Sequence, residues 1–337
     1  MLKCADVMVR AKSNKAKVSD KPNTLIIGAC GQVGSDLTMA LNKKIGAEHV
    51  IISDIREPEL KELQDNTFIS MDVRDTEQLS TVLQTYGISQ IYHMASILSA
   101  RGEQNPRLAW DINMNGLLNV LDAAVEFGVK KVFWPSSIAV FGPNSPKIDT
   151  PQFTTMDPDT IYGISKLAGE RWCHHYHFKH GLDVRSLRYP GLISYKTPAG
   201  GGTTDYAVDI YFKAIEEKKF ECFLSEDTIL PMMYMDDAIK ATIDIMEAPS
   251  DNITVRSSYN VTAFSFSPRE VANEIKKHIP DFNITYNPDF RQAIADSWPE
   301  SINDEFARVE WAWDPEYDLG SMTVDMLENI SKMESAV

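Results

Sequence analysis

The segment Leu25–Gly34 constrains the fold of this chain more than any other stretch. Its first three residues are apolar, as in a buried parallel strand, and three glycines at three-residue spacing lead into a helical pattern. A strand that turns tightly into a helix places free helix amides beside the strand end, where they suit a pyrophosphate. We expect Gly28 to permit the turn, Gly31 to let phosphates approach, and Gly34 to allow close helix–strand packing. A plain glycine-rich turn is the alternative interpretation.

The composition limits the class of partner. The chain has 337 residues, of which 43% are hydrophobic and 24% charged, as in globular proteins with a substantial core. A formal net charge of −15 argues against nucleic acid or an anionic membrane as the main partner. No apolar run approaches the length of a membrane span. The cysteines show neither disulfide nor zinc spacing, which favours a reducing compartment.

Residues 1–23 form a basic leader that differs from the rest of the chain. They carry six Lys or Arg residues against two Asp, without a long apolar core. This pattern is typical of a mitochondrial transit peptide, and a disordered or cloned extension is the alternative. We therefore expect the mitochondrial matrix, or otherwise the cytoplasm, as the location.

The next two predicted strands end in acidic residues. Asp54 closes an apolar run 20 residues after Gly34. There it would accept hydrogen bonds from the adenosine ribose hydroxyls and repel a 2′-phosphate, which favours NAD as the cofactor. A turn cap is its alternative role. The following strand, from Thr67, ends at Asp72 and Val73, which we expect to reach the adenine ring.

Strands and helices continue to alternate, which predicts an α/β fold with a parallel sheet wound right-handedly. A fourth strand, from Gln90, ends at Met94, Ala95 and Ser96, where the small side chains leave room for a cofactor. A long helical pattern covers 107–127, and its Asn113 should make a specific polar contact. A fifth strand over 130–137 delivers the hydroxyls of Ser136 and Ser137 at its carboxyl end.

The helical segment after these serines carries the chemistry. Tyr162 and Lys166 are four residues apart and share one helix face. An ammonium group beside a phenol stabilises the phenolate and lowers its pKa. We therefore expect Tyr162 to act as a base near neutral pH.

These motifs together resemble the extended short-chain dehydrogenase/reductase superfamily over roughly Thr24 to Gly191. More closely, the chain resembles the L-threonine 3-dehydrogenases that share the UDP-galactose 4-epimerase fold. The closer likeness rests on Trp134–Pro143, Leu187–Ile193, Gly200–Tyr206 and Ser297–Asp304. It implies a Rossmann-type doubly wound sheet in an NAD-binding domain of residues 24–190. It also implies a smaller C-terminal α/β region, residues 191–325, that mainly binds substrate.

The resemblance also implies roles for individual residues. Tyr162 would take the proton of the C3 hydroxyl of L-threonine while hydride passes to NAD, giving 2-amino-3-ketobutyrate in threonine catabolism. Lys166 would hold the nicotinamide ribose, Ser137 would bind the reacting oxygen, and Ser136 would help in positioning. Asn113 would support a relay water. The remaining cofactor-binding residues would include Cys30, Gln32, Val33, Tyr189 and Pro190, Cys30 standing where many relatives have a smaller residue.

The substrate pocket is implied by the same likeness. Its residues would be Leu98, Ser99, Ser136, Ser137, Tyr162, Thr203, Thr204 and Trp298. The consecutive glycines 200–202 are typical of a mobile gate, and a surface loop is the alternative. Trp298 has the alternative role of a core aromatic. The resemblance further implies a homodimer formed through helices 107–127 and 162–180.

Competing interpretations remain open at this point. Cys173 and the four histidines between 174 and 180 could bind zinc, but no second element offers ligands, so we expect no metal. A nucleotide-sugar epimerase or dehydratase of the same fold is the second candidate. The absence of arginine between Pro190 and Phe220 favours a small amino acid instead. A non-catalytic NAD-sensing regulator is the third, and a sensor needs no acidic phenol.

Overall fold

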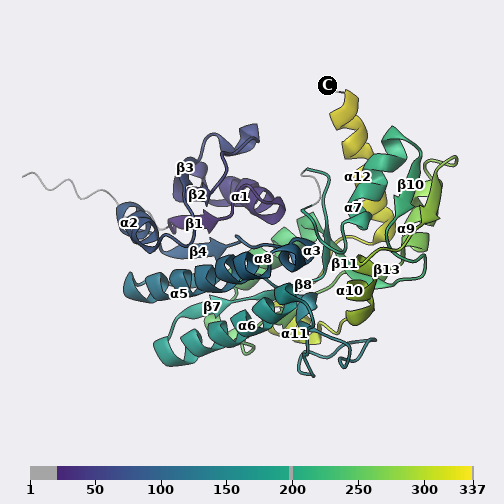
Figure 1. Ribbon diagram of the computed structural model, residues 1–337. Helices are drawn as coiled ribbons and strands as arrows, with labels where there is room; N and C mark the ends of the chain where they lie inside the picture. The colour runs from purple at the N-terminus through teal and green to yellow at the C-terminus, as the bar shows by residue number, and fades with distance from the viewer. Residues whose placement is uncertain (1–20, 197–199, 336–337) are drawn as a thin grey trace, which may run out of the picture.

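A six-stranded parallel sheet forms the core of the larger half of the molecule (Figure 1). The computed structural model describes residues 21–196 and 200–335. Across the sheet the order is β3 (Thr67–Ser70), β2 (Val50–Asp54), β1 (Thr24–Ile27), β4 (Gln90–His93), β5 (Lys131–Phe133) and β7 (Asp183–Arg185). The chain order reverses between β1 and β4, where ligands bind in such sheets. The predicted α/β, Rossmann-type fold is confirmed.

Helices cover both faces of this sheet because its strands are apolar on both sides. On one face lie α2 (Thr76–Tyr86), α5 (Gly116–Glu126) and α6 (Ile161–His180); on the other lie α1 (Gln32–Ile45) and α8 (Met235–Glu247). Leu25 and Ile27 pack into the first layer and Ile26 into the second, as the two-residue period of a strand requires. Helix α8 thus covers the same face of the large sheet as α1, although it comes from the C-terminal part of the chain.

The smaller half is a second α/β layer around its own apolar core (Figure 1). Its sheets are β13–β11–β9 (Phe264–Phe266, Leu230–Tyr234, Gly191–Ile193) and β10–β14 (Lys219–Cys222, Asn283–Tyr286). Its helices are α7 (Tyr206–Glu216), α9 (Pro268–Lys276), α10 (Arg291–Ser297) and α12 (Leu319–Ser335). Helix α9 starts with a capping box between Ser267 and Glu270 and has Pro268 in its first turn. Among the described residues, no helix is both long enough and apolar enough to cross a bilayer.

The predicted strand over 130–137 is wrong in extent. Strand β5 ends at Phe133, and Ser136–Ser137 form β6, which joins β8 (Leu187–Tyr189) and β12 (Tyr259–Asn260) in a separate sheet. Pro135 has no amide hydrogen, so the ladder of the large sheet stops there. The two hydroxyls are therefore delivered by a short second strand.

The predicted helix over 107–127 is interrupted. It consists of α4 (Pro106–Trp110), a π-helix (Asp111–Asn115) and α5, and is preceded by α3 (Ser99–Gln104). The π-helix contains Asn113, the polar residue singled out by the sequence. Such widened turns are frequent at functional sites.

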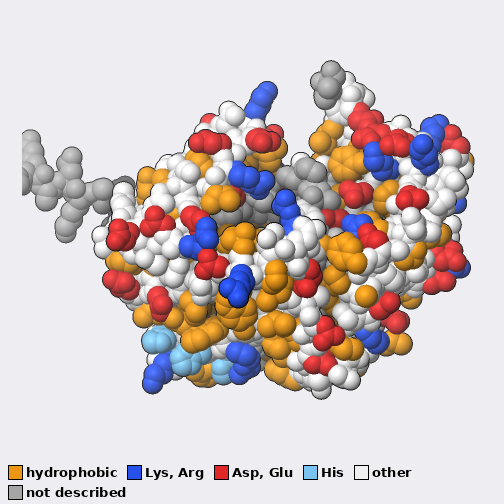
Figure 2. Space-filling view, in the orientation of Figure 1, with side chains coloured by type: hydrophobic (Ala, Val, Ile, Leu, Met, Phe, Trp, Pro, Cys, Tyr) orange, Lys and Arg blue, Asp and Glu red, His pale blue; other side chains and the backbone are white. Residues whose placement is uncertain are grey.

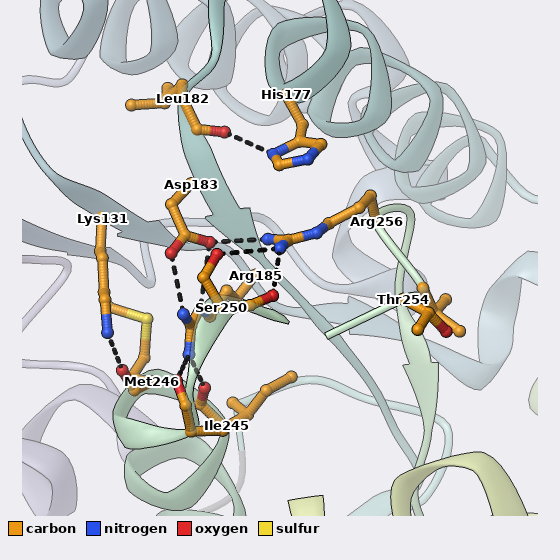
Figure 3. A network of polar contacts seen from close by, with 12 residues as sticks. Lys131, His177, Leu182, Asp183, Arg185, Ile245, Met246, Ser250, Thr254 and Arg256 are labelled. Atoms are coloured by element: carbon orange, nitrogen blue, oxygen red, sulfur yellow. Dashed lines mark hydrogen bonds and ion pairs between the residues drawn. The ribbon is translucent and has the colours of Figure 1, made fainter. Parts of the chain in front are cut away.

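A buried polar network joins the edge of the large sheet to the end of α8 (Figure 3). Arg185 of β7 pairs with Asp183 at 2.8 Å and donates to the carbonyl oxygen of Ala248 at 2.7 Å. Lys131 of β5 donates to the carbonyl oxygen of Met246 at 2.7 Å. Cations at a helix C-terminus satisfy carbonyls that have no helical donor. Helix α8 is thereby fixed against the sheet, and α11 (Glu305–Trp311) packs in the same layer.

Candidate active site

The glycine loop has the tight geometry that its spacing predicts. Gly28 has φ +85°, and a Cβ atom there would lie 2.5 Å from the backbone nitrogen of Ala95. A Cβ atom at Gly34 would lie 2.2 Å from the carbonyl oxygen of Gly28. Only glycine therefore fits at these two positions. At Gly31 the nearest such contact is 3.3 Å, which is close but less restrictive.

The N-terminus of α1 is open to an anion. Gly31 is its N-cap, no side chain caps the first turn, and that turn contains no acidic residue. The amides of this turn have no helical acceptor. The side-chain nitrogen of Gln32 is also buried without a hydrogen-bond partner in the described structure. These unsatisfied donors and the glycine cradle fit a dinucleotide pyrophosphate.

Asp54 holds the glycine loop through backbone amides. Its carboxylate accepts from the Cys30 amide at 3.0 Å and from the Arg56 amide at 3.1 Å. The Arg56 guanidinium donates to the carbonyl oxygen of Cys30 at 3.2 Å. Burial raises the pKa of the Cys30 thiol to about 11, so the thiol stays protonated at neutral pH and is a poor nucleophile.

One cavity of about 810 Å³ connects the glycine loop with the serine, tyrosine and lysine side chains. It lies between the two halves, and Figure 2 shows Lys and Arg side chains near a hollow in the centre of this face. Most predicted site residues line it: Gly28, Cys30, Gly31, Gln32, Val33, Gly34, Met94, Ser96, Leu98, Ser99, Ser136, Ser137, Tyr162, Lys166, Tyr189, Pro190, Thr203, Thr204 and Trp298. Asp54, Asp72, Val73, Ala95 and Asn113 do not.

Tyr162, Lys166 and Ser137 converge at one end of the cavity. The Lys166 ammonium lies 5.4 Å from the centre of the Tyr162 ring and 4.6 Å from that of Trp134. It donates to the carbonyl oxygen of Pro135 at 2.6 Å. The Ser137 hydroxyl is near enough to Tyr162 to lower the pKa of the phenol. The first two turns of α6, which Thr160 caps, therefore place Tyr162 and Lys166 beside β6.

The expected effect of Lys166 on the pKa of Tyr162 is not found. Burial raises the pKa of Tyr162 to about 12, and only the nearby Ser137 hydroxyl opposes this. Burial also lowers the pKa of Lys166 to about 7, so the ammonium loses part of its charge near neutrality. Desolvation therefore outweighs the pairing that the four-residue spacing suggests.

Ser136 faces away from the reacting end. Its hydroxyl donates to Glu170 at 2.7 Å, and Glu170 pairs with Arg188 at 2.7 Å; both charged groups are buried. Arg188 also donates to Asn260 at 3.0 Å, which joins β8 to β12. The geometry therefore gives Ser136 a positioning role beneath the cavity.

Asn113 anchors the loop after β4. Its side chain accepts from the Ile97 amide at 2.8 Å, donates to the Ile97 carbonyl oxygen at 3.0 Å, and approaches the Ser165 hydroxyl at 3.3 Å. The predicted specific polar contact is therefore present. Its amide is occupied by protein partners, which does not favour the expected relay water.

The residues expected near adenine lie outside the cavity. Asp72 pairs with Arg74 at 2.7 Å, and Arg74 also pairs with Asp111 at 3.0 Å. Val73 is buried against α5, where a Cβ atom at Gly116 would meet it at 2.7 Å. Ala95 packs against the backbone of Gly28. None of these three residues lines the cavity; for Ala95 the sequence predicts only that it leaves room for the cofactor.

Another part of the cavity wall joins the two halves of the molecule, beside the start of α6, where the Ile161 amide donates to Glu103 at 2.8 Å. The hydroxyls of Ser99 and Thr203 lie 3.2 Å apart and are buried. Leu98 contacts Gly200, where an added Cβ atom would lie 3.0 Å from it. Trp298 is 6% exposed and lines the cavity, so both predicted roles, pocket residue and core aromatic, describe it.

Sequence reasoning missed several residues that line the cavity. They include Leu60, Ile97, Arg101, Pro135, Leu192, Lys196 and Asp205. Most of them follow a predicted strand end by a few residues, which was the available signal. Which of these side chains turns inward depends on loop geometry, and the sequence does not reveal that.

The cysteine and histidines of α6 do not converge on a metal. Cys173 is fully buried, whereas His177 bonds to the carbonyl oxygen of Leu182 at 3.0 Å and His174 contacts the ring of Phe178. No group of three or more potential ligands is found in the described part of the chain. Figure 2 shows histidines gathered at one edge of the surface.

Comparison with known proteins defines the family. Residues 24–262 match the NAD dependent epimerase/dehydratase family, and the chain belongs to it. It is 46% identical over 312 residues to an uncharacterized epimerase/dehydratase of Staphylococcus haemolyticus, covering 92% of this chain and 98% of that protein. NAD is accordingly the cofactor, and the chain is an NAD-dependent oxidoreductase of this family.

Two solved structures are similar to this chain over most of its length. A GalE-like L-threonine dehydrogenase from Cupriavidus necator, in its holo form, is 52% identical with a TM-score of 0.90, covering 92% of this chain and 100% of that one. A monomeric L-threonine 3-dehydrogenase from a metagenome is 49% identical with a TM-score of 0.89, covering 92% and 99%. These neighbours share the fold predicted from the motifs.

The expected mitochondrial location gains no support from these comparisons. The Staphylococcus relative is bacterial. The first 20 residues of the basic leader lie outside the described part of the chain. The leader therefore remains a feature of the sequence alone.

The glycine loop yields a test. We expect Gly34→Ala to cost about 1–3 kcal/mol of unfolding free energy, because the new methyl forces helix and strand apart. NAD affinity should fall at least as clearly, measured by quenching of tryptophan fluorescence. Gly320→Ala is the matched control, since a Cβ atom there meets its nearest neighbour at 3.5 Å. Unchanged stability and NAD affinity in Gly34→Ala would contradict the assigned contact.

Proposed function

We propose that the protein oxidises the C3 hydroxyl of L-threonine to 2-amino-3-ketobutyrate with NAD. The observation that carries the proposal is one cavity that is lined together by the glycine loop, by Ser137 and Tyr162, and by Thr203. The two threonine dehydrogenase neighbours, at about half sequence identity, support the substrate.

The residues of the cavity divide into holding and reacting groups. The loop amides and Gln32 would hold the pyrophosphate, and Asp54 would face the adenosine ribose. Tyr189 and Pro190 would border the nicotinamide, where Tyr189 is fixed by its bond to Thr242 on α8. NAD, when bound, accepts the hydride that leaves C3 of the substrate.

The proton of the C3 hydroxyl would leave separately from the hydride. Tyr162 would take it from the C3 hydroxyl, while Ser137 donates a hydrogen bond to the same oxygen. Lys166, beside the Tyr162 ring, favours the phenolate when it is charged. Asn113 fixes the wall of the cavity through Ile97, and Ser136 fixes β6 through Glu170. Both act by position.

A nucleotide-sugar epimerase or dehydratase is the second candidate, because the family includes such activities by name. Two short polar side chains, Ser99 and Thr203, and the ring of Trp298 line the cavity, and a lining of this kind favours a small polar substrate. A nucleotide sugar needs a second long cleft there.

A substrate panel decides between these candidates. We expect NADH to form from L-threonine, and much more slowly from L-serine or 3-hydroxybutyrate, when followed by absorbance. UDP-glucose and UDP-galactose serve as the comparison, with sugar products separated by chromatography. Conversion of a UDP-sugar without oxidation of L-threonine would overturn the proposal.

The pKa of Tyr162 predicts the pH dependence. A base whose pKa is raised to about 12 is mostly protonated at neutral pH. The reactive phenolate fraction therefore grows with pH, and kcat/KM should rise by nearly tenfold per unit between about pH 7 and 9.

Tyr162→Phe should lower kcat by about 10²- to 10⁴-fold while NAD still binds. Tyr176→Phe, on the same helix but bonded to Asp122, is the control; unchanged turnover in Tyr162→Phe would exclude it as the base.

We also propose a homodimer formed through α4–α5 and α6. Large apolar side chains are exposed there: Leu108, Trp110, Ile164, Trp172 and Phe178. Such a patch is typical of a protein interface. Light scattering should give twice the chain mass, and Phe178→Glu with Trp172→Glu should give one chain mass. A monomer for the unmodified protein, as named for the metagenome neighbour, would contradict this.

A further inference from the structure

Four cationic side chains line the cavity: Arg56, Arg101, Lys166 and Lys196. Three of them are engaged by the protein itself. Arg56 donates to Cys30, Lys166 donates to Pro135, and Lys196 pairs with Asp36. Within residues 21–196 and 200–335, Arg101 forms no hydrogen bond and no ion pair, which leaves its guanidinium available to a ligand.

Arg101 lines the cavity from the segment that follows β4, which is distant in sequence from the glycine loop. It belongs to α3, whose first residue, Ser99, contacts Thr203 at 3.2 Å. Its aliphatic stem rests on Gly201, where an added Cβ atom would lie 3.0 Å from its Cγ. Gly201 has φ +93°, so a side chain at this position would be strained as well as crowded. The arginine stem thus takes the place that a side chain would fill.

The wall beneath this stem is fixed. Asp205 accepts from the amides of Gly201 and Gly202, each at 2.7 Å. Those two bonds hold the glycine segment and leave Asp205 unpaired with Arg101. The stem of Arg101 therefore packs on a fixed backbone segment, and the planar guanidinium at its end keeps its N–H donors available for a ligand.

The other side chains in this part of the cavity wall carry no positive charge. They are Leu98, Ser99, Thr203, Thr204, Trp298 and Asp205, whose carboxylate accepts from the two glycine amides. A substrate carboxylate that entered here without a cation would lose its hydration and gain only neutral hydrogen bonds. A guanidinium offers two parallel N–H donors that match the two oxygens of a carboxylate.

We propose that Arg101 binds the carboxylate of the amino-acid substrate and so selects carboxylates over uncharged alcohols. The inference deepens the proposed function, on which it rests. A diphosphate is the other anion that an arginine fork fits, and the arginine-free segment between Pro190 and Phe220 does not exclude it, because Arg101 lies outside that segment. The test therefore includes both anions.

The experiment pairs a change in the protein with a change in the ligand. Arg101→Gln is compared with the unmodified protein on L-threonine and on L-threoninamide, in which a neutral amide replaces the carboxylate. We expect KM for L-threonine to rise about 10- to 100-fold, with kcat changed far less, because one charge-assisted contact is lost. KM for L-threoninamide should stay nearly the same. The KM of Arg101→Lys for L-threonine should lie between the values of the unmodified protein and of Arg101→Gln, because lysine keeps the charge but not the two parallel donors.

A binding measurement separates this proposal from the proposed function. Calorimetric titration of L-threonine into the protein with NADH requires no turnover, and Arg101→Gln should weaken it by the same factor. Arg107→Gln, an exposed arginine on α4 that does not line the cavity, should leave all values unchanged. L-Threonine that binds through Arg101 but is not oxidised would overturn only the proposed function.

Other outcomes overturn the Arg101 assignment. They are an unchanged affinity for L-threonine in Arg101→Gln, an equal loss for L-threonine and L-threoninamide, and no binding of L-threonine to the unmodified protein. A weaker dissociation constant for NAD, or for UDP-glucose, in Arg101→Gln would instead place a diphosphate on this arginine.

Discussion

The buried ion pair between Glu170 and Arg188 connects the parts of the molecule that meet at the cavity. Glu170 comes from the helix that carries Tyr162 and Lys166, and Arg188 from the strand beside Ser137. Removing one partner of such a pair leaves an uncompensated charge in the interior, which costs about 3–5 kcal/mol. Because Ser136 bonds to the same carboxylate, strand β6 cannot move independently of α6. The positions of Ser137 and Tyr162 therefore depend on a buried ion pair as well as on apolar packing.

Burial sets the chemistry at this end of the cavity more strongly than pairing does. The phenol of Tyr162 is moved away from its charged form, and the amine of Lys166 is moved away from its own. Both shifts have one cause, the loss of water around the groups. A ligand that brings positive charge or donors to the phenol would reverse part of the shift on Tyr162, so occupancy and reactivity are coupled here.

The sequence predicts the fold well because its signals are local. The apolar run before Gly28 and the glycine spacing each act within a few residues, and the structure confirms the strand and the helix that they predict. The break after Phe133 was missed, although Pro135 was visible, because the partner strand β8 lies more than 50 residues away. Arg101 was missed for a similar reason, since its availability depends on Gly201, a hundred residues further along the chain. Contacts between distant segments decide which side chains face the ligand, and no local pattern encodes them.

The two amide bonds of Asp54 link cofactor choice to loop order. The carboxylate that we propose reads the ribose also holds Cys30 and Arg56 in place. A change that admits a 2′-phosphate by removing this carboxylate would also release the backbone at the start of α1, where the pyrophosphate must lie. Altered selectivity at this position would therefore come with weaker binding of either dinucleotide, unless a second residue took over the two amides. In this chain, a single carboxylate, that of Asp54, would therefore determine both the preference between cofactors and the shape of the phosphate-binding loop.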